Sequence, residues 1–425
     1  MTVTSSTPHQ RLLRLTRSGT RVAAVDLQHS HRRSAAIFGP VAVPDRVEAI
    51  RRLRAMVDAG PALRLCLQPS TTSRRWRRAD ADIADAVIEV PDSHDPLVLL
   101  DRLHRLPESG LRVALAGNYV AIDFSHGLGD TAFCQAVADV VVGAVTLDDP
   151  HWDAYRHRVS PLAAAGLATF GSDPRRLWRL GGLHRRRPIP DPGPAGDPHP
   201  VSRTAPTARM VRLPADDVAR LRTLRDRHRP GVSMFAIYTI ALIRALSDAG
   251  ISLTPAVTIP FDVRPYLPAG IDTLATFSAG LAFPIGPDTA PHSLQALLTE
   301  SASCGRPVAN MLVSTAKIRL ASREQLAADH WALVGDTPRA DLLHSFVGRL
   351  PQTDAIRFLD PAAASNYTVS DPISPRGITV TSAMIGDGAL CMSAAFHDEH
   401  LDADRIDRAI SGIAGAIEST IRTPG

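Results

Sequence analysis

Lysine is almost missing from this sequence of 425 residues, because Lys317 is the only one and arginine supplies the rest of the 47 basic side chains. Asp and Glu number 43, so the formal net charge is only +4. A charge this small on a chain this long does not mark a nucleic-acid-binding surface. Two arginine clusters, 74–78 (RRWRR) and 185–187 (RRR), are interpreted as solvated surface or as a patch that attracts an acidic partner.

Cysteines and long apolar runs are also scarce. The four cysteines, Cys66, Cys134, Cys304 and Cys391, are scattered among apolar neighbours, which predicts reduced core thiols rather than disulfides. The longest apolar run, 234–243, is far below the roughly 20 residues that span a bilayer, and the first residues lack the apolar stretch of a signal peptide. We therefore expect a cytoplasmic protein without a membrane span. The histidines lack the spacing of metal ligands, so no metal is expected.

The composition, with 44% hydrophobic and 21% charged residues, is that of a globular protein, and the length favours two lobes. The clearest break is the segment 181–206, whose seven prolines are expected to exclude helix and central strand. We predict an N-terminal lobe over 1–180, a crossover linker over 181–206 and a C-terminal lobe over 207–425.

Hydrophobic periodicity predicts an α/β (α+β layered) fold with mixed, largely antiparallel sheets. Residues 111–116 and 119–124 are predicted to form a hairpin around Gly117-Asn118, and short turns of this kind join antiparallel strands. A helix is expected from Asp130 to about Val145. Further helices are expected at 46–59, 215–228, 233–248 and 403–421, and further strands at 63–68, 208–213, 254–263, 377–384 and 389–396.

The stretch IDFSHGLGDTAF, 122–133, places His126 between a strand and a helix. Histidine titrates near neutral pH and suits a general base at such a loop. Gly127 and Gly129 would let the chain turn tightly and let a substrate approach the backbone. Asp130 could face an arginine and fix the shape of the loop. An isolated HxxxD pattern is more often a solvated turn followed by a helix cap, so catalyst and turn residue both stay open.

A second HxxxD, at 400–404, lies among several acidic residues and has no glycine. It is interpreted as a surface loop leading into an acidic helix start. His397, at the end of the preceding strand, is a weaker catalytic candidate.

Three segments occur in order along the chain: SHGLGD (125–130), FDVRPYLP (261–268) and SNYTVS (365–370). Together they resemble the chloramphenicol acetyltransferase-like superfamily, which includes nonribosomal-peptide condensation domains, BAHD acyltransferases and polyketide-associated acyltransferases. The resemblance runs from about Val113 to the C-terminus. The chain departs from the family pattern in three ways: Ser125 replaces a first histidine, Thr131 replaces a glycine after the acid, and no DFGWG segment is present.

The resemblance implies two lobes with a channel between them. His126 would be the general base, and Asp130 would form a structural salt bridge to Arg264. Ser365 and Asn366 would line the channel, Thr368 and Ser370 (with Asn366) are candidate oxyanion donors, and Thr131 would contact the substrate. Read from the residues alone, Arg264 can equally be a surface arginine before a turn, and 365–366 can be a loop entering a strand.

The function implied by the resemblance is acyl transfer from a thioester, either acyl-CoA or an acyl carrier protein, to a hydroxyl or amine acceptor in lipid, polyketide or peptide natural-product biosynthesis. The thioester is a co-substrate, and no permanently bound cofactor is expected. Two alternatives stay open. The chain could be a degenerate relative that binds a carrier protein or partner enzyme without chemistry, or the arginine clusters could bind nucleic acid.

Overall fold

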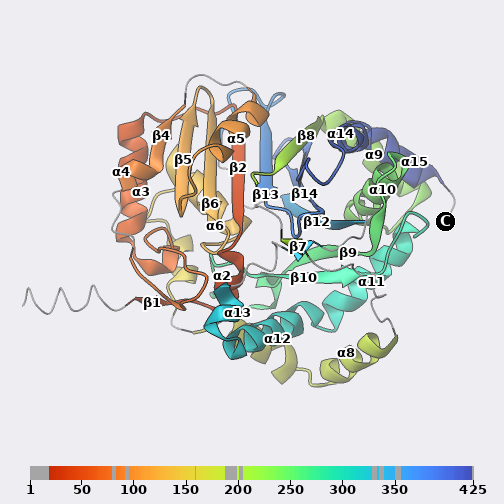
Figure 1. The fold of residues 1–425 in the computed structure, drawn as a ribbon, viewed down its shortest axis with the longest axis horizontal. Helices are drawn as coiled ribbons and strands as arrows, with labels where there is room; N and C mark the ends of the chain where they lie inside the picture. Colours follow the sequence, from red (N-terminus) through yellow and green to blue (C-terminus); the bar gives the residue numbers. More distant parts are fainter. Residues whose placement is uncertain are drawn as a thin grey trace, which may run out of the picture.

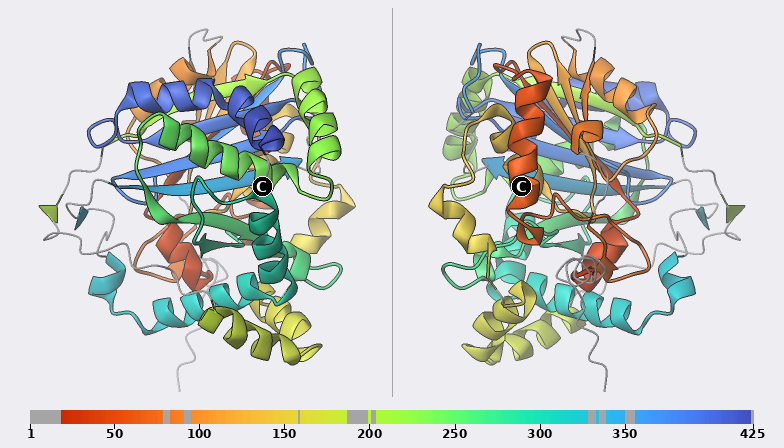
Figure 2. Two further views of the ribbon diagram at one scale, coloured as in Figure 1. Left: turned by 90° about the vertical axis from the view of Figure 1, so that its right-hand side faces the viewer. Right: turned by 90° about the vertical axis from the view of Figure 1, so that its left-hand side faces the viewer.

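The computed structural model describes residues 19–78, 83–90, 95–157, 159–186, 199–200, 204–327, 333–334, 339–349 and 356–423. Two large mixed sheets lie side by side, one in each lobe, and helices cover their outer faces (Figures 1 and 2). The predicted fold class, an α/β fold with mixed sheets, is confirmed.

The first sheet has five strands in the order β13-β2-β6-β5-β4. Neighbouring strands are antiparallel except for the parallel pair β4 and β5. Two helices, α3 and α6, pack on one face of this sheet in a shared hydrophobic core, and α5 packs on the other face. The bounds are β2 Arg33–Gly39, α3 Arg46–Asp58, β4 Val87–Glu89, α5 Pro96–His104, β5 Leu111–Ala116, β6 Tyr119–Ser125, α6 Thr131–Val142 and β13 Ser365–Ser370.

The second sheet has six strands in the order β10-β9-β12-β14-β15-β8. The pairs β9/β12 and β12/β14 are parallel and the others antiparallel. Helices α9, α10, α14 and α15 pack on one face of this sheet (Figure 2). The bounds are β8 Thr207–Leu213, α9 Ala215–His228, α10 Met234–Asp248, β9 Leu253–Asp262, β10 Ser278–Phe283, β12 Ala340–Arg349, β14 Gly377–Met384, β15 Leu390–Phe396, α14 Ala403–Ser411 and α15 Ile413–Arg422.

Alternation along the strands of the second sheet separates its two faces. Val257 and Ile259 of β9 are buried under the helices. Thr258 and Pro260, between and beside them, face the space between the lobes. The sheet therefore uses one face for the core and leaves the other for a cavity.

Strand β13 joins the two halves of the chain. It comes from the C-terminal half but pairs antiparallel with β2 in the first sheet. Its Thr368 carbonyl accepts a hydrogen bond from Ser393 of β15, so β13 also contacts the second sheet. The first sheet is therefore not built only from residues before 207, because it includes this strand from the C-terminal half of the chain. The predicted lobe boundaries themselves stay a prediction.

The remaining elements surround these sheets: β1 Thr20–Arg21, α2 Ala24–His29, η1 Pro61–Leu63, β3 Arg75–Trp76, α4 Ile83–Ala86, η2 Pro150–Tyr155, α7 Pro161–Gly166, η3 Leu167–Gly171, α8 Arg175–Arg186, β7 His199–Pro200, η4 Arg264–Tyr266, α11 Pro291–Ser303, α12 Arg306–Leu320, α13 Arg323–Ala327 and β11 Leu333–Val334. Helices α8 and α12 lie along the lower side of the molecule in Figure 1.

Three local predictions are wrong. Residues 63–68 do not form a strand, because Arg64 has a left-handed φ of 66° that breaks extended structure after η1. The helix expected over 403–421 is interrupted at Gly412. Helix α8 continues to Arg186, inside the segment expected to exclude helix, because the prolines of that segment begin only at Pro188. Most of the predicted linker, 187–198 and 201–203, lies outside the described residues.

All four cysteines are buried and free, which confirms the prediction of core thiols. Within the described ranges, no helix is both long and apolar enough to cross a bilayer.

Candidate active site

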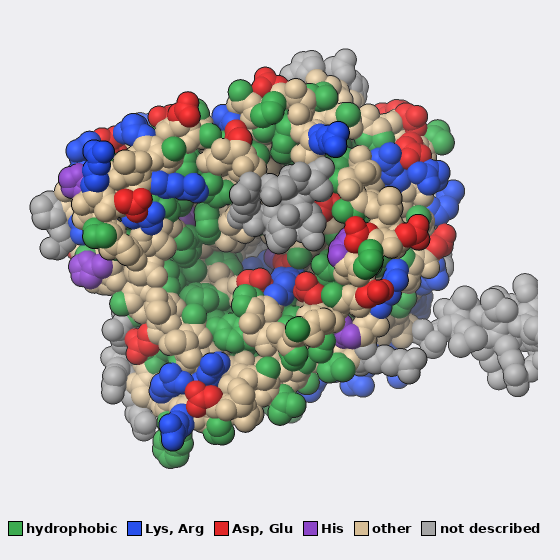
Figure 3. All heavy atoms as spheres, turned by 180° about the vertical axis from the view of Figure 1, so that it is seen from behind, with side chains coloured by type: hydrophobic (Ala, Val, Ile, Leu, Met, Phe, Trp, Pro, Cys, Tyr) green, Lys and Arg blue, Asp and Glu red, His purple; other side chains and the backbone are tan. Residues whose placement is uncertain are grey.

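A cavity of about 750 Å³ lies between the two sheets. One wall is the loop after β6 and the start of α6, and the opposite wall is the open face of the second sheet. The face in Figure 3 is hollowed near its middle, with hydrophobic side chains on one wall and charged side chains of both signs below. The cavity-lining residues that matter here are His29, Ser34, His126, Asp130, Thr131, Gln135, Asp139, Trp152, Tyr155, Arg264, Thr368 and Ser370.

His126 follows the last residue of β6, and its ring lines the cavity. Its Nδ1 lies 2.9 Å from the Gly129 carbonyl oxygen and 3.2 Å from the Thr276 hydroxyl. Thr276 donates its own proton to the His126 carbonyl oxygen at 2.8 Å, so both neighbours of Nδ1 are acceptors. The proton of a neutral ring therefore belongs on Nδ1. No described residue hydrogen-bonds Nε2, which leaves that nitrogen with a free lone pair.

Burial lowers the pKa of His126 below its ordinary value, and the nearby Arg32 cation acts in the same direction, whereas Asp130 opposes it. The His29 ring lies beside it with a centroid separation of 4.8 Å. Burial also lowers the pKa of His29, well below the usual range. His126 is thus neutral at physiological pH, the form that a base requires.

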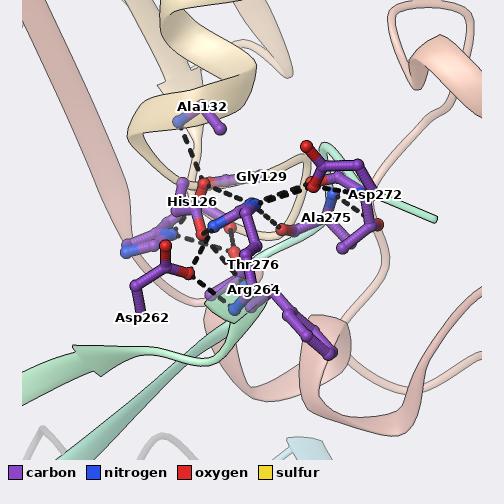
Figure 4. A network of polar contacts seen from close by, with 11 residues as sticks. His126, Gly129, Ala132, Asp262, Arg264, Asp272, Ala275 and Thr276 are labelled. Atoms are coloured by element: carbon purple, nitrogen blue, oxygen red, sulfur yellow. Dashed lines mark hydrogen bonds and ion pairs between the residues drawn. The ribbon is translucent and has the colours of Figure 1, made fainter. Parts of the chain in front are cut away.

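Asp130 and Arg264 form a two-pronged ion pair across the lobes, with Arg264 Nη1 2.9 Å from Oδ2 and Nη2 2.9 Å from Oδ1. Figure 4 shows Arg264 and His126 within one network of polar contacts. The Asp130 carboxylate also accepts the backbone N–H of Ala132, which caps α6, and the N–H of Phe277. Arg264 donates further to the carbonyl oxygens of Thr273 and Ala275. The pair therefore ties the start of α6 to the loop that carries Thr276.

The histidine loop has a second anchor that sequence reasoning missed. Arg64, which is buried, donates to the carbonyl oxygens of Gly127, at 3.0 Å, and Leu128. The same guanidinium pairs with the buried Asp26 at 2.9 Å. The loop is thus held by Arg64 from the N-terminal half of the chain and by Arg264 from the C-terminal half. The only signal for Arg64 was its place in a segment predicted as strand.

The two glycines of the loop are required because neighbouring protein atoms leave no room for a side chain. From the sequence they were instead expected to permit a tight turn and the approach of a substrate. A Cβ on Gly127 would lie 2.1 Å from Ser30 Oγ, and one on Gly129 would lie 2.2 Å from the Leu274 carbonyl oxygen. The groups that exclude a side chain belong to the protein, and neither glycine has a positive φ.

Some of the residues predicted to contact substrate line the cavity, and others do not. Thr368 and Ser370 line the cavity, and the Ser370 hydroxyl lies 2.8 Å from that of Ser34. Thr131, the first residue of α6, also lines it. Ser365, at the other end of β13, is buried and donates to Gly39 O at 3.3 Å. Neither it nor Asn366 is part of the cavity lining.

The second HxxxD is not part of this cavity. Asp402 caps α14 by accepting the N–H groups of Asp404 and Arg405, as its acidic setting predicted. His397 is buried beside Thr204, and neither His397 nor His400 lines the cavity. The arginine cluster at 74–78 also lies outside the lining, with Trp76 buried in the core. The side chains of the 185–187 cluster lie outside the described residues.

Sequence reasoning missed two side chains that lie beside the His126 ring, those of Thr276 and His29. Thr276 comes from a loop without any recognisable pattern, and His29 comes from α2, almost a hundred residues before the motif. Among the described residues, no group of three or more His, Cys, Asp or Glu side chains is placed to hold a metal ion.

Comparisons with known proteins place the fold. No family model and no curated protein matches the sequence. The solved structure of TRI3 trichothecene 15-O-acetyltransferase from Fusarium sporotrichioides matches with a TM-score of 0.59 at 10% identity, over 96% of this chain and 94% of that one. Polyketide synthase associated protein 5 from Mycobacterium tuberculosis matches with a TM-score of 0.54 at 14% identity, over 96% and 98%.

The first condensation domain of the calcium-dependent antibiotic synthetase matches with a TM-score of 0.53 at 15% identity, over 99% of this chain and 97% of that one. Each of these three structures matches this chain over 96% or more of its length. The chain therefore has the two-lobed fold of the chloramphenicol acetyltransferase-like superfamily.

Proposed function

We propose that this protein is an acyltransferase that moves an acyl group from a thioester to a hydroxyl or amine acceptor, with His126 as the general base. The observation that supports it most is the state of the His126 ring. Its Nδ1 proton is held by acceptors, and its unprotonated Nε2 belongs to a ring that lines the cavity between the lobes. A base with this tautomer can take a proton from a bound acceptor.

In the proposed reaction the acceptor oxygen or nitrogen bonds to the thioester carbonyl carbon while its proton passes to Nε2. The carbon–sulfur bond then breaks, and the leaving thiolate takes the proton back from the ring. The hydroxyls of Thr368 and Ser370 line the same cavity and are our candidates to stabilise the oxyanion. A positioned base contributes about 10²–10⁴ in rate and an oxyanion donor about 10²–10³. The donor would be acyl-CoA or an acyl carrier protein.

Thiol release should be measured from a panel of acyl-CoA and acyl carrier protein thioesters, each with alcohol and amine acceptors. Replacing His126 by alanine should reduce transfer at least tenfold, on the estimate of about 10²–10⁴ for a positioned base. The control is His400→Ala, which alters the second HxxxD outside the cavity and should leave transfer unchanged. Equal turnover by His126→Ala and the unmodified protein would reject the role of His126.

The same panel separates the proposal from the degenerate alternative. A protein that binds acyl carrier protein but releases no thiol with any donor and acceptor pair would be a binding module. Transfer activity lost in His126→Ala while carrier binding persists would instead support the enzyme.

A further inference from the structure

Helix α6 carries a polar stripe into the cavity. Its sequence, TAFCQAVADVVV, is apolar apart from Thr131, Gln135 and Asp139. Their spacing of four residues places all three on one face of the helix, and all three line the cavity. The opposite face, which includes Phe133 and Val137, is buried in the core of the first lobe. The cavity therefore continues along α6 from the His126 loop to Asp139.

Asp139 differs from the other buried carboxylates. Asp26 pairs with Arg64, and Asp123 pairs with Arg33 and Arg112. Asp139 is only 2% exposed, yet no Lys or Arg among the described residues pairs with it. Within the described part of the chain, the one group that donates to its side chain is the Gln135 amide, with Nε2 2.6 Å from Oδ1. A buried carboxylate without a counter-charge is unfavourable, and burial raises the pKa of Asp139 to about 7.

When Asp139 is ionised, the free hydrogen-bonding atoms at this place are acceptors. Gln135 donates to Asp139, which leaves the Gln135 carbonyl oxygen and the second Asp139 oxygen without a donor among the described residues. A primary ammonium offers three donors and no acceptor, so it matches two acceptor oxygens better than a hydroxyl does. Trp152 and Tyr155 of η2 line the same cavity, and aromatic rings also favour cations.

We propose that one substrate of this protein carries a protonated primary amine, and that this ammonium binds Asp139 and Gln135. We name these two residues the amine subsite. This inference rests on the proposed function, because the role given to the subsite is to select a substrate of the acyl transfer. Asp139 follows Asp130 by nine residues, and a helix rises about 1.5 Å per residue, so the ammonium would sit about 13 Å along α6 from the reacting end.

The test is direct binding, measured by calorimetry, with two probes of nearly equal length. N-acetyl-1,8-diaminooctane carries a terminal ammonium, and N-acetyloctylamine ends in a methyl group. A hydrogen-bonded charge contact predicts that the unmodified protein binds the ammonium probe about 10- to 100-fold more tightly. Asp139→Asn, which keeps the shape and the acceptor for Gln135, should remove this preference and leave the neutral probe unaffected. The matched control, Asp153→Asn on the exposed side of η2, should bind both probes like the unmodified protein.

Binding of both probes within twofold of each other, absence of binding by either probe, or a preference that survives in Asp139→Asn would overturn the subsite. The measurement is repeated on His126→Ala, which should keep the preference because the ring contributes only to chemistry. A protein that prefers the ammonium probe but transfers no acyl group would refute the proposed function and support the subsite. Transfer activity without a preference for the ammonium probe would support the proposed function and refute the subsite.

Discussion

The ion pair between Arg264 and Asp130 leads to a specific energetic prediction for Arg264→Ala. The two side chains are only 17% and 12% exposed, and two parallel hydrogen bonds of 2.9 Å join them. Breaking a buried pair by removing one partner costs about 3–5 kcal/mol. Asp130 keeps the N–H groups of Ala132 and Phe277, so its charge is not stranded. We therefore expect the lower end of the range, about 3 kcal/mol of unfolding free energy.

Equilibrium urea unfolding at pH 7.5 measures this loss. Arg264→Lys keeps the charge but not the planar fork, and should lose roughly half as much as the alanine variant. Asp130→Asn keeps a helix cap, so a double-mutant cycle with Arg264→Ala isolates the pair, and the two losses should be strongly non-additive. The control is Arg51→Ala, which removes a similar two-pronged contact to Glu48 on an exposed helix face.

Arg51→Ala should behave like other surface substitutions, because exposed ion pairs contribute little. A loss below about 1 kcal/mol in Arg264→Ala would refute the reasoning, since a buried pair with these bonds should cost about 3–5 kcal/mol to break. Simple additivity with Asp130→Asn would refute it as well.

Three further predictions concern backbone packing, protonation and stability. Gly129→Ala should lose about 1–3 kcal/mol because its Cβ would meet Leu274 O at 2.2 Å, whereas Gly182→Ala in α8, with open space around it, should gain up to about 1 kcal/mol; thermal unfolding of both variants checks this. For a substrate pair without an ammonium group, so that the ionisation of Asp139 does not enter, the pH profile of kcat/KM should fall on the acid side only below pH 6.5, because burial lowers the folded pKa of His126; an acid limb above pH 6.5 contradicts this. Asp139→Asn should stabilise the ligand-free protein at pH 8, because the folded pKa of about 7 exceeds the ordinary 3.8 and the stability that this carboxyl contributes at low pH is lost as the pH rises from about 3.8 to about 7, by about 4 kcal/mol at most. Urea unfolding should therefore show a clearly larger gain for Asp139→Asn at pH 8 than at pH 5.

Much of the fold could be predicted from periodicity. The hairpin at 111–124, the helix after Asp130 and the two C-terminal strands were predicted within a few residues, because alternation and capping are local signals. The pairing of β13 with β2 could not be predicted, because it joins strands more than 300 residues apart and depends on how the lobes meet. The segment 63–68 was wrong because Arg64 adopts a left-handed φ, which is uncommon for a residue other than glycine.

The residues of the candidate site also fall into those that the sequence could predict and those that it could not. His126, Asp130 and Arg264 were selected from motifs, and the structure brings all three to the lining of one cavity. Thr276 and Arg64 were missed because each acts through one side chain reaching a distant backbone, and nothing in their neighbours reveals it. Ser365 and Asn366 came from the resemblance alone, and they are absent from the cavity lining, to which the other end of β13 contributes Thr368 and Ser370.

The state of the His126 ring is the claim on which the proposed chemistry depends. Long-range ¹H–¹⁵N correlation spectra of histidine-labelled protein, assigned by comparison with His126→Ala, read the protonation of each ring nitrogen. At pH 7.5 we expect the His126 signals to show a protonated Nδ1 and an unprotonated Nε2. A proton on Nε2, or a doubly protonated ring at that pH, would contradict the account.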